Sequence, residues 1–82
     1  MTRIKTLPPD PDGMNADRSR WAEAAIFEFQ RQTGADLEDA VSDLLADLMH
    51  WCDRRKLDFD KELDRARSHY DEETEDIPAE ES

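Results

Sequence analysis

Residues 36–55 read DLEDAVSDLLADLMHWCDRR, and this stretch decides the fold. Its apolar residues recur at steps of three and four, the spacing that gathers side chains along one face of an α-helix. A helix over 36–55 is therefore predicted, with an acidic N-cap at its start and bases at its end that match the helix dipole. The apolar face consists of Leu37, Val41, Leu44, Leu48 and Trp51.

The same stretch carries a second, acidic face. Four aspartates recur at helical spacing behind the apolar residues, and a histidine continues the row one turn further on. This acidic face is the first candidate surface for a partner, and an inert solvated face is the alternative. Its members are Asp36, Asp39, Asp43, Asp47 and His50.

Helical patterns flank the central stretch on both sides. One runs over 15–33, from Asn15 as an expected N-cap to Gly34, whose position suits the left-handed residue after a helix. The other runs over 58–72, with Asp58 as its expected N-cap. The links between the three segments are short, so consecutive helices should be neighbours in space.

These patterns predict an all-α protein with a small three-helix domain over residues 15–73. Residues 1–14 contain four residues that disfavour a helix, Pro8, Pro9, Pro11 and Gly13. They are expected to form a flexible, disordered arm. Residues 74–82 are expected to be a disordered acidic tail, since residues 71–82 hold seven acids and no base.

The apolar faces predict both a core and a further contact surface. On the first helix, Phe27 and Ala24 lie on the side opposite the main apolar face, which indicates a possible homodimer contact. Single exposed apolar residues are the alternative explanation. The predicted core consists of Trp21, Ala25, Phe29, Leu37, Val41, Leu44, Leu48, Trp51, Cys52, Phe59, Leu63 and Tyr70.

Size and charge limit the classes of partner. A chain of 82 residues buries only about 60% of its unfolded surface, so further burial against a partner is expected. The net charge of -11 argues against direct binding of nucleic acid or anionic membrane, which is held mainly by Lys and Arg. A protein partner with a basic or apolar surface is expected. One cysteine and the lack of a signal-like or membrane-spanning run favour a cytoplasmic location.

No pattern for catalysis, a cofactor or a metal is found. Cys52 falls on the apolar side of its helix, where a cysteine acts as a small hydrophobe. A di-metal bundle needs matching ligands on facing helices, and no second copy of a carboxylate and histidine set is present. All-helical nucleotide pyrophosphohydrolases pair Glu-x-x-Glu with Glu-x-x-Asp, but the single Glu-x-x-Glu here, Glu72 with Glu75, has no helix after it.

The stretch DLLADLMHWCDRRKLDFDKELDRARSHYDEE, residues 43–73, resembles small uncharacterised bacterial proteins of the kind carried on phages, plasmids or integrated elements. The resemblance implies a bacterial accessory role and assigns no role to particular residues. The leading hypothesis is a noncatalytic protein–protein interaction module. The alternatives are a nucleic-acid mimic that inhibits a DNA- or RNA-binding enzyme, as anti-restriction and anti-CRISPR proteins do, and, more weakly, a metal-dependent hydrolase.

Overall fold

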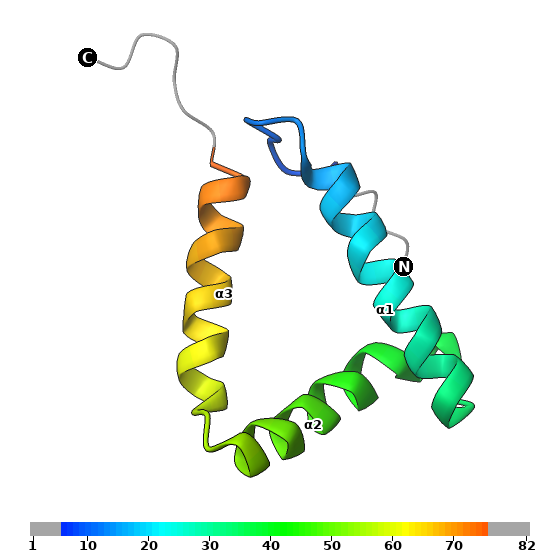
Figure 1. Ribbon diagram of the computed structural model, residues 1–82. Helices are drawn as coiled ribbons and strands as arrows, with labels where there is room; N and C mark the ends of the chain where they lie inside the picture. Colours follow the sequence, from blue (N-terminus) through cyan, green and yellow to red (C-terminus); the bar gives the residue numbers. More distant parts are fainter. Residues whose placement is uncertain (1–5, 76–82) are drawn as a thin grey trace, which may run out of the picture.

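The computed structural model describes residues 6–75 and contains three α-helices (Figure 1). They are α1 (Asn15–Thr33), α2 (Leu37–Arg55) and α3 (Phe59–Glu73), and no strand occurs among the described residues. The predicted all-α, three-helix fold is confirmed. The disorder expected of the two ends falls in part on residues 1–5 and 76–82, which lie outside the described residues.

Individual residues at the helix ends determine where the helices begin and end. Gly34 follows α1 with a φ of 77°, in the left-handed region, and its N–H donates to the carbonyl oxygen of Gln30 at 2.7 Å. Asp58 precedes α3, and its carboxylate accepts a hydrogen bond from the backbone N–H of Lys61 at 3.2 Å. Asp36 occupies the N-cap position of α2, but its side chain makes no capping hydrogen bond.

The start of α1 differs from the prediction that Asn15 is its N-cap. Asn15 is the first helical residue, and the cap position belongs to Met14. The carboxylate of Asp12 accepts from the N–H of Met14 at 3.0 Å, and that of Asp10 accepts from the N–H of Asn15 at 3.2 Å. Upstream aspartates therefore accept from two of the backbone N–H groups at the start of α1, and the Asn15 side chain is left for another contact.

The three helices form the sides of an open triangle (Figure 1). α1 and α3 rise from the two ends of α2, and each packs against α2. Two residues of the described chain are buried, Ala40 at 0% exposure and Cys52 at 5%. One lies near each end of α2, so the tight packing is confined to the two junctions.

The third corner of the triangle is closed by polar groups. The side-chain amide of Asn15 donates to the carbonyl oxygen of Glu73 at 2.9 Å, and Nε of Arg18 lies 3.3 Å from the Glu73 carboxylate. Asp12 completes the group, with its carboxylate 2.8 Å from Arg18. We call Asp12, Asn15, Arg18 and Glu73 the polar corner. It joins the first turn of α1 to the last turn of α3.

The predicted core does not close within one chain. Of its members, Cys52 is buried, and Phe29, Leu44 and Phe59 are half-buried. The reason is the open arrangement: α1 and α3 meet α2 only near its ends, so the apolar faces between the corners have no neighbour. The Cα radius of gyration of 16.0 Å agrees, since a compact domain of this length has about 12 Å. The exposed members are Trp21, Ala25, Leu37, Val41, Leu48, Trp51, Leu63 and Tyr70.

Candidate functional site

The acidic face of α2 is exposed along its whole length. Asp36, Asp39, Asp43, Asp47 and His50 are all exposed. Among residues 6–75, no ion pair within 4.0 Å involves any of them. The face therefore presents free carboxylates to solvent, as expected of a surface available to a partner.

The end of α1 lies beside the middle of this acidic face. Asp43 and Asp47 line a hollow of 310 Å³ together with Phe29 and Thr33 of α1 and the nearby Ala35. The neighbouring Ala40 is fully buried, which places the α1 contact between the acidic and apolar faces of α2. The acidic face is thus bordered by α1 on one side.

The apolar face of α2 forms the second surface of the site. Leu37 is 62% exposed, Val41 54% and Trp51 51%, although each is a residue type that proteins usually bury. Leu48 is also exposed. Several exposed apolar side chains along one helix face are the kind of surface that proteins often use to bind a partner.

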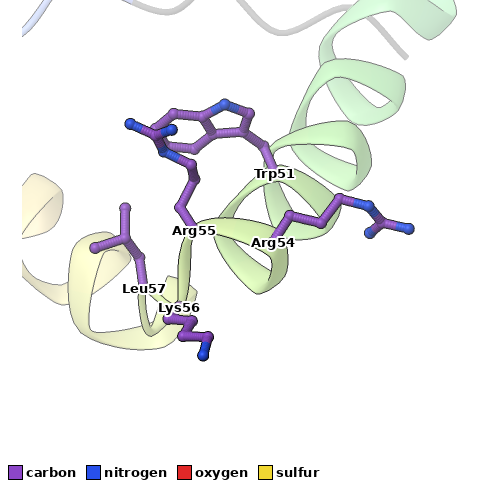
Figure 2. Close-up of a pocket in the computed structure, with 5 residues that line it drawn as sticks. All are labelled: Trp51, Arg54, Arg55, Lys56 and Leu57. Atoms are coloured by element: carbon purple, nitrogen blue, oxygen red, sulfur yellow. The ribbon is translucent and has the colours of Figure 1, made fainter.

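A basic hollow at the end of α2 was missed by the sequence reasoning. Trp51, Arg54, Arg55, Lys56 and Leu57 line a hollow of 430 Å³ where α2 turns into α3. In Figure 2 the Arg55 side chain extends along the Trp51 ring, while Arg54 and Lys56 project away from that pair. The guanidinium carbon of Arg55 lies 5.3 Å from the ring centroid, within cation–π range.

Two local features explain how this basic hollow arises. Lys56 has a φ of 61°, so the chain turns sharply there, and the N–H of Leu57 donates to the Cys52 carbonyl oxygen at 2.8 Å. The sequence signal is the run Arg54-Arg55-Lys56 in a chain of net charge -11. From the sequence, that run indicates only compensation for the helix dipole, and Trp51 only a core residue.

The polar corner lies beside a third hollow, which is larger than the two described above. This hollow of 700 Å³ is lined by the segment before α1, the first turns of α1 and the end of α3, including Leu7, Ala22 and Tyr70. The hydrogen bond from Arg18 lowers the pKa of Asp12 to about 2, and the same contact raises the pKa of Arg18. These shifts are accounted for by an ion pair that fixes helix ends, so they identify no catalytic group.

The candidate oligomer contact on α1 is also exposed. Phe27 is 53% exposed, and Ala24 is exposed as well. Neither residue lines one of the three hollows described above. Phe27 and Ala24 therefore stay a predicted oligomer contact.

Two further observations concern metals and membranes. No group of three or more His, Cys, Asp or Glu residues in the described part of the chain is placed to hold a metal ion. Within the same part, none of the helices combines the length and the apolar character needed to cross a membrane.

Comparison of the chain with protein-family models, with curated proteins and with solved structures finds no match.

Proposed function

We propose that this protein is a noncatalytic protein–protein interaction module of the cytoplasm, with α2 as its binding element. One observation carries the proposal: the described chain buries only Ala40 and Cys52, while thirteen large apolar side chains are exposed. Folding of a small domain depends on removing such surface from water. A partner that covers α2 supplies the burial that the single chain lacks.

The two faces of α2 have different roles in this proposal. The apolar face provides the binding free energy, at roughly 25 cal/mol for each Å² of apolar surface removed from water. The neighbouring free carboxylates, Asp39 among them, favour partners with basic groups at the rim and accelerate association at low salt.

A quantitative binding experiment with matched variants tests the proposal. The wild-type chain, immobilised, should retain a protein partner, and Val41→Glu should abolish this retention because it places a charge in the apolar face. Ser42→Glu is the control: Ser42 is exposed, adjacent in sequence, and lies about 100° further around the helix. A chain that stays monomeric, retains no partner and protects its α2 amides fully by itself would contradict the proposal.

The free carboxylates support a second candidate function, a nucleic-acid mimic. Asp39, Asp43 and Asp47 follow one another along α2 without ion-pair partners in the described chain, and carboxylates about 6 Å apart approximate the spacing of phosphates. Replacing all three by Asn should remove salt-sensitive binding to a basic groove of a DNA-binding enzyme. Unchanged affinity of the Asn variant would exclude the mimic and leave the apolar face as the binding surface.

A further inference from the structure

We propose that the hollow of 700 Å³ beside the polar corner is filled by the N-terminal segment of the same chain, with Ile4 as its apolar anchor and Arg3 and Lys5 at its acidic rim. We call this hollow the corner hollow. It is lined by the segment before α1, by α1 and by the end of α3, so the inference goes beyond the function proposed for α2. Three observations support it: the lining of the hollow, the place where the chain meets it, and the charges around it.

The lining of the corner hollow is mainly apolar and is left uncovered by the described chain. Leu7, Ala22 and Tyr70 line it from three different segments. Leu7 is 90% exposed and Tyr70 54%, so both keep much of their apolar surface in water. Its volume falls within the range of about 300–1,000 Å³ in which proteins hold apolar groups of ligands. An apolar side chain that enters the hollow would remove this surface from water.

The chain meets the corner hollow at Leu7. Leu7 and Pro8 line the hollow, and the chain beyond them is held in place, since the carboxylate of Asp10 accepts from the N–H of Asn15 at 3.2 Å. A residue that precedes proline favours an extended backbone, as Leu7 does here. Three extended residues span at most about 11 Å, so Ile4 is within reach of the hollow.

The charges around the corner hollow favour a basic segment. Asp10 lines the hollow and has no ion-pair partner within 4.0 Å in the described chain, whereas Glu73 and Asp12 share Arg18. The last turn of α3 contains no base, although the carbonyl end of a helix favours cations. Residues 71–75 hold four acids around this helix end, which attract cations through their summed field rather than through defined pairs.

The two ends of the chain offer different occupants, and charge distinguishes them. Each end carries one isoleucine three residues away from a residue that lines the hollow, Ile4 at the N-terminal end and Ile77 at the C-terminal end. Residues 1–7 contain two bases and no acid, whereas residues 76–82 contain three acids and no base. The field at the end of α3 therefore attracts the first segment and repels the second.

The order of residues in the N-terminal segment suits this placement. In an extended chain, neighbouring side chains point to opposite sides, so Arg3 and Lys5 share one side and Ile4 takes the other. With Ile4 in the apolar lining beside Tyr70, the two basic groups lie at the rim, where Asp10 is free to pair with them. Their methylene chains also cover apolar surface there.

NMR of the full chain with labelled isoleucine methyl groups tests the inference. The sequence contains three isoleucines, Ile4, Ile26 and Ile77, and a single tyrosine, Tyr70, so substitution of each isoleucine by valine assigns every signal. The Ile4 methyl groups should show nuclear Overhauser effects to the Tyr70 ring. Ile77 should show none, and Ile26, which lines none of the three hollows, is the internal reference.

Matched variants test the apolar anchor and the charges separately. Ile4→Ser should lower the Tm by about 4 °C or more, and the control Ile77→Ser should leave the Tm unchanged. Arg3→Gln with Lys5→Gln should weaken the contact between Ile4 and the Tyr70 ring, and so should added salt. A contact that is unchanged by both would overturn the role given to the two bases.

Three other results would overturn the inference. Contacts of the Ile77 methyl groups with Tyr70, in place of those of Ile4, would assign the hollow to the other end of the chain. The absence of any contact between Ile4 and Tyr70 would show that the segment does not fill the hollow. A contact seen only between differently labelled copies in a mixed sample would assign the occupant to a second chain. None of these results depends on binding through α2, so the proposed function is tested separately.

Discussion

The side chains of the polar corner have partners within the chain, whereas those of the apolar face of α2 are mostly exposed. At the polar corner, Arg18 lies between Asp12 and Glu73, and each charged group finds its partner inside the chain. On the apolar face, Leu37 and Trp51 are more than half exposed, so most of their apolar surface remains in contact with solvent. Polar contacts close the triangle, but the burial that would stabilise it is missing from the single chain. This contrast supports the proposal that a partner covering α2 supplies the missing burial.

The largest expected effect comes from the apolar junction between α1 and α2. Ala40→Leu should lower the free energy of unfolding by about 1–3 kcal/mol, because Ala40 is fully buried and a larger side chain forces the helices apart. Chemical denaturation measures the change. Ala24→Leu is the control, since Ala24 is exposed on α1 and the same substitution there should have little effect. Equal losses in both variants would contradict close packing at Ala40.

The connection after α1 should give the next largest effect. Gly34 has a φ of 77°, and nothing lies within 4 Å of the place that an alanine methyl group would take, so any loss in Gly34→Ala comes from backbone strain rather than from a clash. We expect a decrease of about 1–2 kcal/mol in the free energy of unfolding, measured by chemical denaturation. Gly34→Asn should lose less, because Asn tolerates the left-handed region better. Identical stabilities for the two variants would contradict this account of the junction.

The cap of α3 should contribute less than either junction. Asp58→Ala removes the acceptor for the N–H of Lys61 and should cost about 1 kcal/mol, seen as a lower Tm. Asp58→Asn keeps an acceptor oxygen and should retain most of the stability. If Asp58→Asn lost as much stability as Asp58→Ala, the capping hydrogen bond would not be the cause of the loss.

The smallest effect on stability is expected at the polar corner. Asp12 is half exposed, and solvent screens its pair with Arg18. Its pKa is about 2 in the folded chain against an ordinary value of 3.8, so the contribution to stability is present above 3.8 and is lost as the pH falls toward 2. An NMR titration of the Asp12 carboxyl carbon should show this low midpoint. In Arg18→Gln the midpoint should move toward 3.8, and an unmoved midpoint would contradict the pair.

The helices could be predicted from the sequence because local signals determine them. Gly34 and Asp58 act through their own backbone neighbours, so spacing and residue type were sufficient. The error at Asn15 has a local cause as well: Asp10 and Asp12, further upstream, hydrogen-bond to the first backbone N–H groups. Helix boundaries thus depend on few residues, all of them close in sequence.

The packing of the helices could not be predicted in the same way. The spacing of the apolar row from Leu37 to Trp51 predicts a helix face that packs against another element. It does not say whether that element belongs to the same chain. Ala40 was missed because a small residue between two faces gives no hydropathy signal, although it permits close approach of helices. The basic hollow depends on the turn at Lys56, which the sequence run alone does not reveal.

Hydrogen exchange of the α2 amides over a range of protein concentrations tests the central claim most directly. The dilute chain is predicted to protect α2 weakly, because most of its apolar face is exposed in the described chain. The amides of Val41 and Leu48 are the ones to follow, with Phe27 on α1 as the internal reference. Strong protection of α2 that does not change with concentration would contradict the account, since it would show that the single chain is stable without a partner.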